Sequence, residues 1–395
     1  MRLLYLRHRY GLGYESLCRE VADSIGWRRF CRIGLEGRVP HPTTLVKLVR
    51  RAGPEVIAQL NTALCEKLAA DRLLRGRKLR VDTTVVEADI DYPTDADLLE
   101  QAVRKLGGLV RRIKARGAAS RTRFGDRGRA AGRRMRQLAH SLRRRSGNAM
   151  AEVDRLTGEV AQIARRTLGQ VQTVARNARR ALGRRPSDGR LARLVGELQE
   201  TIEHAGRLLW QTDQRLSGNR VIPDRLVSLA DPDARPIRKG KPQHPTQFGY
   251  PLLVAEDERG FVADHQLQQG NPPDAPQLVP AVERVAKLTG RVAGTVVGDR
   301  GFGTAANDRA LAERGVTRVG LQRKGTLSPT RTALEQTRAF RRMRNWRVGI
   351  QARISHLKRG FGLRRTRLRR LPGAKTWAGL GVFAYNLQRM TVVPA

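Results

Sequence analysis

Residues 78–90 form a strand signal that lies far from any other. The segment is rich in valine and threonine, a β-branched composition typical of a β-strand, and Tyr92 and Pro93 end it. The next strand signal comes only at residue 248, after a long helical stretch. Because a lone strand is not stable, residues 78–90 must pair with strands from beyond that stretch. The sequence therefore predicts a sheet that a helical insertion interrupts after the first strand.

Strand and helix signals alternate after the insertion. Residues 248–255 and 260–267 predict a hairpin that turns at residues 256–259. Further short strands are predicted at 294–298 and 317–321, and helices at 275–288, 305–314 and about 332–359. This pattern predicts a mixed α/β fold.

The interrupting stretch is helical and strongly basic. Apolar residues recur at helical spacing, as at Leu106, Leu109 and Ile113. Residues 101–220 hold 29 basic and nine acidic residues, within a chain of formal net charge +41. A solvated charged face is one interpretation. The size of the excess favours antiparallel helices that pack on one side and contact phosphates on the other.

Residues 1–75 predict helices, with a break at Gly53-Pro54 and a further helix at residues 55–70. Two interpretations are open: a helix-turn-helix that reads DNA, and a small helical bundle that only packs on a neighbour. No run of 18 apolar residues suggests a transmembrane helix, and no signal peptide is evident. The three cysteines form no CxxC pair, so we expect neither a disulfide framework nor structural zinc, and a cytoplasmic location.

Two aspartates sit where a sheet could present them together. Asp82 lies within the first strand, and Asp299 follows the short apolar strand at 294–298. Each could instead be a turn or capping residue. Together, in so basic a chain, they predict a magnesium pair for phosphoryl transfer, because hard cations prefer carboxylate oxygens.

The motifs resemble those of the DDE transposases of bacterial insertion sequences, over essentially the whole chain. Val81 to Glu87 resembles the strand of the family's first aspartate, and Gly298 to Phe302 resembles its second-aspartate motif. Further similar stretches are Tyr92 to Asp95, Asp231 to Gly240, Gln269 to Asp274, Ile354 to Arg359, Thr376 to Gly381, and Asn386 with Leu387.

The resemblance implies a ribonuclease-H-like core with an N-terminal helical domain and an all-helical basic insertion. The expected boundaries are a DNA-binding domain at 1–75, core segments at 76–94 and 221–360, the insertion at 95–220, and a basic segment with a helix at 361–395. It also implies metal-dependent strand cleavage and transfer. The expected cofactor is Mg²⁺, or Mn²⁺, as two ions held by Asp82 and Asp299. The expected partner is double-stranded DNA, both terminal inverted repeats and target. A homodimer on DNA, nucleoid association and no membrane contact are expected as well.

The third acid of the family is missing. Its glutamate lies between an arginine and a lysine that match Arg347 and Lys358, but Gln351 occupies the position, and Arg344 replaces the usual tyrosine. Three interpretations are open: a substitution introduced to trap a DNA complex, a natural loss of cleavage, or a weak amide ligand. Glu335, the last acid of the chain, is an alternative third ligand. A catalytically silent DNA-binding protein derived from a transposase is therefore the alternative function. A basic RNA-binding or nucleoid protein would leave the motif order unexplained.

Residues 338–370 hold 13 basic residues and no acid, which predicts phosphate contact near the scissile bond. The expected DNA-binding residues are Arg300, Arg344, Arg347, Arg353, Lys358 and Arg359. Structural roles are favoured for His265 and His356, and core packing rather than base stacking for Trp346 and Trp377.

Overall fold

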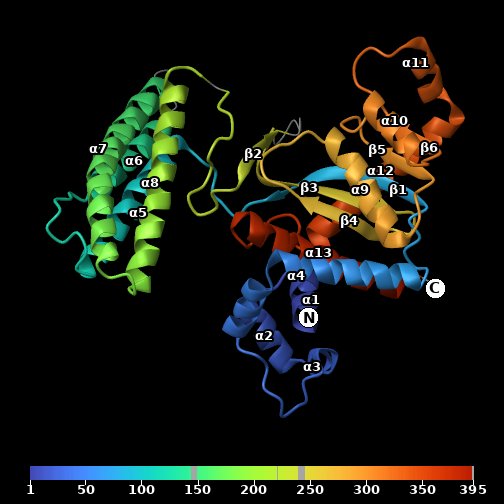
Figure 1. Ribbon diagram of the computed structural model, residues 1–395, viewed down its shortest axis with the longest axis horizontal. Coiled ribbons are helices and arrows are strands. Elements are labelled where there is room, and N and C mark those ends of the chain that lie inside the picture. The colour runs from blue at the N-terminus through green and yellow to red at the C-terminus, as the bar shows by residue number, and fades with distance from the viewer. Residues whose placement is uncertain (144–148, 220, 239–244, 394–395) are drawn as a thin grey trace. The chain divides into compact units, whose positions relative to one another are not determined.

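The computed structural model describes residues 1–143, 149–219, 221–238 and 245–393. Contacts divide the chain into two compact units, one of Met1–Asp89 with Pro236–Ala395 and one of Ile90–Arg235 (Figure 1). Of the family-like stretch at residues 231–240, Lys239 and Gly240 lie outside the described residues. Within the described part of the chain, no helix combines the length and apolar character that crossing a bilayer requires.

One mixed sheet forms the centre of the first unit. Its strands are β1 (Lys78–Glu87), β2 (Arg235–Arg238), β3 (Thr246–Asp257), β4 (Val262–Leu267), β5 (Thr295–Gly298) and β6 (Arg318–Leu321). The order is β2-β3-β1-β5-β6, and β4 also pairs with β3. β1 is antiparallel to β3 and parallel to β5, and β5 is parallel to β6. The predicted mixed α/β class is confirmed, and β1 pairs with strands from beyond the helical stretch, as expected.

The predicted hairpin is confirmed, with its turn two residues later than expected. β3 and β4 pair antiparallel, but β3 runs on to Asp257 and β4 begins at Val262. The Asp257 carboxylate accepts the N–H groups of Arg259 and Phe261, which closes the turn within a few residues. At the other side of β4, the Asn386 amide exchanges two hydrogen bonds with the main chain of Val262. A side chain therefore satisfies backbone groups that a neighbouring strand would otherwise pair.

The two faces of the sheet differ in chemistry. Leu79, Val81 and Val296 face an apolar core that includes residues of α4 (Pro42–Ala70), α9 (Ala275–Thr289) and α10 (Ala305–Glu313). Alternate residues of a strand point to opposite faces. Arg80, between Leu79 and Val81, therefore points to the other face, where it contacts α12 (Arg338–Gly360).

The helix predicted at about 332–359 is two helices. α11 (Pro329–Gln336) ends before Thr337, and α12 begins at Arg338. The Thr337 hydroxyl accepts the N–H of Phe340, so this residue caps the second helix. Helical periodicity did not reveal the break between α11 and α12, because apolar residues continue on both sides of it.

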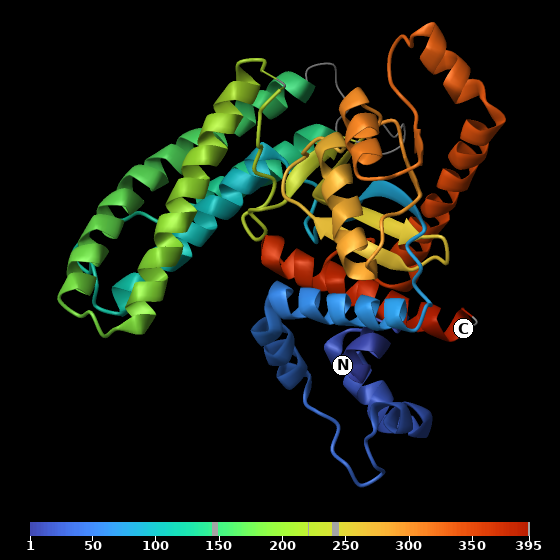
Figure 2. The same ribbon diagram turned by 45° about the vertical axis from the view of Figure 1, so that its right-hand side comes forward.

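The N-terminal helices belong to the same compact unit as the sheet. They are α1 (Arg2–Tyr10), α2 (Tyr14–Asp23), α3 (Ile25–Cys31) and α4. The predicted break at Gly53 is a kink within α4, where Gly53 has φ 66° and ψ −176°. Both views show α4 beside α13 (Arg370–Val392) (Figures 1 and 2).

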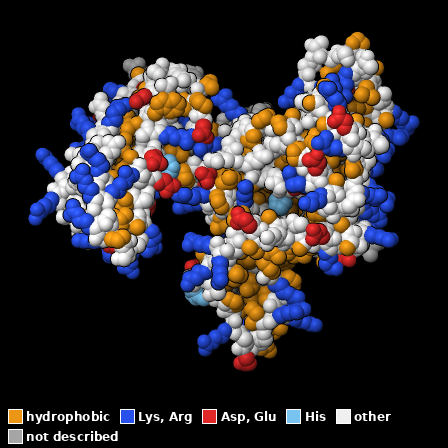
Figure 3. All heavy atoms as spheres, viewed as in Figure 1, with side chains coloured by type: hydrophobic (Ala, Val, Ile, Leu, Met, Phe, Trp, Pro, Cys, Tyr) orange, Lys and Arg blue, Asp and Glu red, His pale blue; other side chains and the backbone are white. Residues whose placement is uncertain are grey.

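The second unit is a helical bundle. It contains α5 (Asp95–Ala115), α6 (Gly128–Arg143), α7 (Ala149–Gly183) and α8 (Gly189–Leu216). Leu106, Val171 and Leu198 lie among its fully buried core residues. A turn at residues 184–188 joins α7 to α8, and Asp188 accepts the N–H of Leu191 to cap α8. Lys and Arg side chains clearly outnumber Asp and Glu on the visible surface of the unit (Figure 3).

Candidate active site

Asp82 lies within β1 and Asp299 directly follows β5, at the point where the parallel pairing of the two strands ends. β1 and β5 are paired up to Val81 and Gly298, so each aspartate is the next residue after a paired position. Two residues earlier, Arg80 pairs with Val297, and both of these side chains face α12. Because the side-chain period of a strand is two, Asp82 and Asp299 continue the same face. The sheet thus brings together two acids that are more than two hundred residues apart in the chain.

A buried ion cluster holds α12 on this face. Glu256 has no exposed surface, and its two carboxylate oxygens each lie 2.6 Å from the Nε of an arginine, Arg80 and Arg353. Arg80 also donates to the main-chain oxygen of Trp346 at 3.0 Å. A Cβ at position 349 would lie 2.1 Å from a terminal nitrogen of the Arg80 guanidinium, so a larger residue there would displace Arg80. The cluster fixes the helix that carries Gln351, whose own side chain is exposed.

A third carboxylate lies beside Asp299. A Cβ placed on Gly301 would be 2.9 Å from an oxygen of Asp274 and 2.9 Å from an oxygen of Asp299. The two oxygens are therefore at most twice that distance apart, on either side of a glycine. The buried Asn307 amide donates to the carbonyl oxygens of Ala275 and Phe302 at 2.9 and 2.8 Å, which ties the two loops together.

Sequence reasoning did not select Asp274 as a site residue. It begins α9 as the N-cap, yet its side chain makes no capping hydrogen bond. The signal that could have found it is its place in the family-like stretch Gln269 to Asp274, directly before a helix. Its proximity to Asp299 depends on loop packing, which a one-dimensional pattern does not contain.

The oxygen-rich donor set suits a hard divalent cation. Asp82, Asp299 and Asp274 offer carboxylates, and Gln351 offers an amide oxygen. Among the residues with described positions, no three His, Cys, Asp or Glu side chains form a group that could hold a metal ion. In general, Mg²⁺ is held by one or two carboxylates plus substrate phosphate and water. Because residue 301 is a glycine, no side chain of that residue occupies the space beside the Asp274 and Asp299 carboxylates.

Glu335 is engaged elsewhere. Its carboxylate accepts the main-chain N–H of Arg323 at 3.1 Å and pairs with Arg331 at 2.9 Å. Arg331 also pairs with Asp308 of α10. These contacts account for Glu335 as part of a local ion network that anchors α11.

The basic residues expected to contact DNA differ in their surroundings. Arg300, Arg344 and Arg359 are exposed, whereas Arg347 and Lys358 are partly buried. The Nε of Arg347 is buried without a hydrogen-bond partner. Arg353 does not fit the expected DNA role, because its guanidinium pairs with Glu256 and lies over the Tyr385 ring.

The histidines and tryptophans have structural surroundings. His356 makes edge contacts with the rings of Phe361 and Tyr385, and burial lowers its pKa. Trp377 is 5% exposed and donates its indole N–H to Gly362. Trp346 lies under the guanidinium of Arg80.

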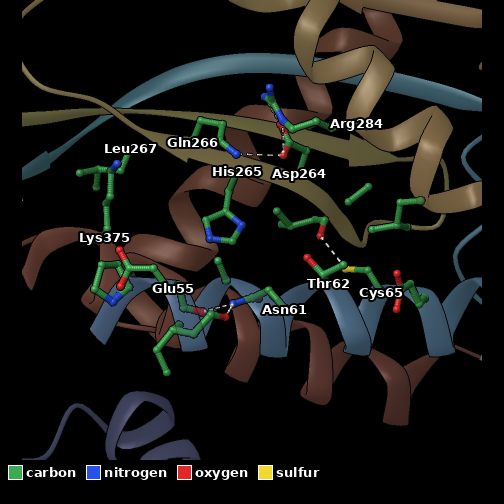
Figure 4. Close-up of a pocket in the computed structure, with 18 of the residues that line it drawn as sticks. Glu55, Asn61, Thr62, Cys65, Asp264, His265, Gln266, Leu267, Arg284 and Lys375 are labelled. Atoms are coloured by element: carbon green, nitrogen blue, oxygen red, sulfur yellow. Dashed lines mark hydrogen bonds and ion pairs between the residues drawn. The ribbon is translucent and has the colours of Figure 1, made fainter. Parts of the chain in front are cut away.

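His265 lines a cavity away from the aspartates. The cavity measures about 530 Å³ and lies between α4, β4, α9 and α13. Figure 4 shows His265 above Asn61, with Asp264 paired to Arg284 nearby. Burial lowers the pKa of His265, so it is neutral at physiological pH. Asp82, Asp299 and Gln351 are not among the lining residues.

Comparison with known protein families agrees with this geometry. The family described as "Transposase DDE domain" matches residues 225–387, and "Transposase domain (DUF772)" matches residues 1–51. The chain belongs to the DDE transposases of insertion elements. Comparisons with curated proteins and with solved structures gave no match.

Membership of this family indicates a function for the sheet. The DDE domain implies a ribonuclease-H-like core, transposases act on DNA, and DDE transposases generally use divalent metals. The matched segments contain Asp274, Asp299 and Gln351 of the transposase, whereas Asp82 lies outside both. Strand pairing therefore supplies the relation between Asp82 and the matched domain.

Proposed function

We propose that this transposase binds the ends of its element and carries out metal-dependent cleavage and transfer of DNA strands. The observation that supports the proposal is the parallel register of β1 and β5, which pairs Val81 with Gly298, the residues directly before Asp82 and Asp299. When bound, a divalent cation would stabilise the charge that develops on phosphate oxygens during an in-line displacement. Asp82 and Asp299 would hold it, as Mg²⁺ or Mn²⁺ and as two ions in the full site.

The remaining residues tune and position the site. Asp274 adds negative charge beside Asp299, where the family's third acid is absent. Gln351 offers only a neutral oxygen, which holds Mg²⁺ less well than a carboxylate. The Glu256 cluster keeps α12 on the sheet, and the exposed Arg300, Arg344 and Arg359 bind phosphates near the reacting one.

The rest of the chain would bind DNA away from the reacting phosphate. The basic helices at residues 95–216 and the N-terminal helices offer many exposed arginines, such as Arg166, Arg180 and Arg19. Transposition joins two element ends and a target, so we propose a homodimer on double-stranded DNA.

The alternative function is a silent DNA-binding protein derived from a transposase. Gln351 is the observation in its favour, because the chain has no Asp or Glu after Glu335 and α12 therefore offers no acid. Retained Asp82, Asp299 and Asp274 argue against it.

Cleavage of element-end DNA by the chain and by Gln351→Glu, with Mg²⁺ and Mn²⁺, tests the proposal. We expect faster cleavage by the glutamate form, because a charged ligand strengthens metal binding. If neither form cuts while both bind the ends tightly, the silent alternative holds. Gln59→Glu, which adds the same charge at an exposed position on α4, is the matched control for charge.

A further inference from the structure

Arg7 is a buried cation for which the described residues provide no anion. The residue is 4% exposed, and its Nε and one terminal nitrogen have no hydrogen-bond partner. The guanidinium lies 3.9 Å from the centre of the Tyr14 ring and 4.7 Å from that of Trp377. Aromatic faces attract the charge but leave the N–H donors unused. Burying a charge is costly unless it is paired, so this arrangement requires an anion.

Arg7 lines a cavity of about 330 Å³ whose other charged residues are mainly arginines. Arg364, Arg365 and Arg367 also line it, together with Asp89. Asp89 and Glu87 lie 3.5 and 3.7 Å from Arg365. Arg364 and Arg367, both exposed, form no ion pair with any acid in the described ranges. The cavity thus holds a clear excess of positive charge.

The pKa shifts of the buried residues Arg7 and His8 agree with this excess of positive charge. Burial lowers the pKa of Arg7, Tyr14 opposes the shift, and the nearby charge of Arg367 adds to it. Burial and then Arg7 lower the pKa of His8 to about 3, so His8 is neutral at physiological pH. Neither residue gains a counter-charge from its neighbours.

We propose that this cavity binds a phosphate group of the DNA strand on which the transposase acts, an inference that rests on the DNA substrate proposed above. Guanidinium groups match the geometry of phosphate oxygens, and several of them can bind one phosphate. The unused donors of Arg7 would bind the phosphate at the base of the cavity. Arg364 and Arg367 would bind it from the rim.

The position of the cavity relates it to the candidate active site. The N–H of Glu87, the last residue of β1, donates to the carbonyl of Arg364, and Thr366 donates back to Glu87. Glu87 lies five residues after Asp82, and five residues of strand span about 17 Å. About five base pairs of DNA cover that distance. A phosphate held here would set the distance along the strand to the reacting phosphate.

Inorganic phosphate is the first probe, added to the full chain against chloride at equal ionic strength. At ten times its Kd, phosphate should raise the Tm by about 3 °C. Arg7→Met and Arg367→Ala should abolish this rise, and the exposed neighbour Arg369→Ala should keep it. Without phosphate, Arg7→Met should be as stable as the wild type or more so, because it removes an unpaired buried charge. A loss of stability in both buffers, with the phosphate effect kept in Arg367→Ala, would show a purely structural Arg7.

Element-end DNA is the second probe, with affinity measured by anisotropy over a range of salt concentrations. Arg367→Ala should weaken binding about tenfold and reduce the slope of log affinity against log salt by about one, beyond the effect of Arg369→Ala. If phosphate stabilises the chain but Arg367→Ala and Arg369→Ala bind DNA equally well, the cavity does not bind a DNA phosphate and the inference fails. If even the wild type binds no DNA, the proposed function fails instead. An adventitious ion only is the conclusion if chloride and phosphate act alike.

Discussion

Two groups of charged side chains lie along the face of the sheet that α12 covers, about 7 Å apart along β1. In the first, fully buried Glu256 is enclosed by Arg80 and Arg353. In the second, Asp82 and Asp299 are partly exposed carboxylates that directly follow the paired residues Val81 and Gly298, and the partly exposed Asp274 lies near Asp299. The first group pairs opposite charges within the chain. The second collects like charges, an arrangement suited to a cation from outside.

The difference indicates how one strand can serve both stability and chemistry. Arg80 and Asp82 share a face of β1, and Arg80 forms an ion pair with the fully buried Glu256. Charges that the fold pairs should matter for stability, and charges gathered near the surface should matter for metal binding. The following substitutions test that separation.

The largest effect is expected from Asp82→Asn. Removing this carboxylate should lower strand cleavage by on the order of a thousandfold, since it removes a ligand of the cation that would stabilise the developing negative charge. The Tm should change much less than in a substitution of buried Glu256, because Asp82 is partly exposed. Cleavage assays and thermal unfolding on the same preparation measure both. For this test the Gln351→Glu background is used if the parent chain cuts too slowly, and a large drop in Tm would break the comparison.

Glu256→Gln should have the opposite profile. It leaves two arginines beside a neutral group, and breaking a buried pair costs about 3–5 kcal/mol. Denaturant unfolding measures the loss, with the exposed Glu313→Gln on α10 as control. A loss below about 1 kcal/mol would mean that the cluster does not anchor α12.

Asp257 extends the comparison to a buried carboxylate that accepts hydrogen bonds from main-chain N–H groups instead of pairing with arginine side chains. Burial raises its pKa to about 6, although the N–H groups of Arg75, Phe261 and Arg259 oppose the shift. Its folded pKa exceeds its ordinary value of 3.8. The associated stability is therefore complete below about pH 4 and is lost as the pH rises through 6. Relative to Asp257→Asn, the wild type should lose up to about 2–3 kcal/mol between pH 4 and 7. Equal pH profiles would contradict this.

The smallest effect is expected from Asp274→Asn. Mn²⁺ affinity, measured by calorimetry without DNA, should fall about tenfold, a typical cost for a residue that supports a metal site. Gly301→Ala should act in the same direction, because its methyl group would meet both carboxylates. If Asp82→Asn weakens Mn²⁺ binding and Asp274→Asn does not, Asp274 is outside the site. If neither does, the metal site itself is wrongly placed.

Local patterns identified most of the core elements. The strand at 78–90, the hairpin and the helix at 275–288 agree closely with β1, β3, β4 and α9, because two-residue and helical periodicities are short-range signals. β2 was missed, because its sequence contains one β-branched residue, Ile237, beside a proline and two arginines. The break at Thr337 was also missed, because a capping hydroxyl within a helical run resembles any other polar residue.

The sequence by itself determined the element types, the excess of positive charge and the acids at Asp82 and Asp299, because these depend on neighbouring residues or on composition. Only the tertiary structure decided which charges meet. The register of β1 against β5 pairs Val81 with Gly298, the residues directly before Asp82 and Asp299. Asn307 ties the Asp274 loop to the Asp299 loop, and the chain folds Arg7 against Trp377. Each of these contacts joins residues that are distant in the chain, and long-range packing, not local pattern, sets the distance between them.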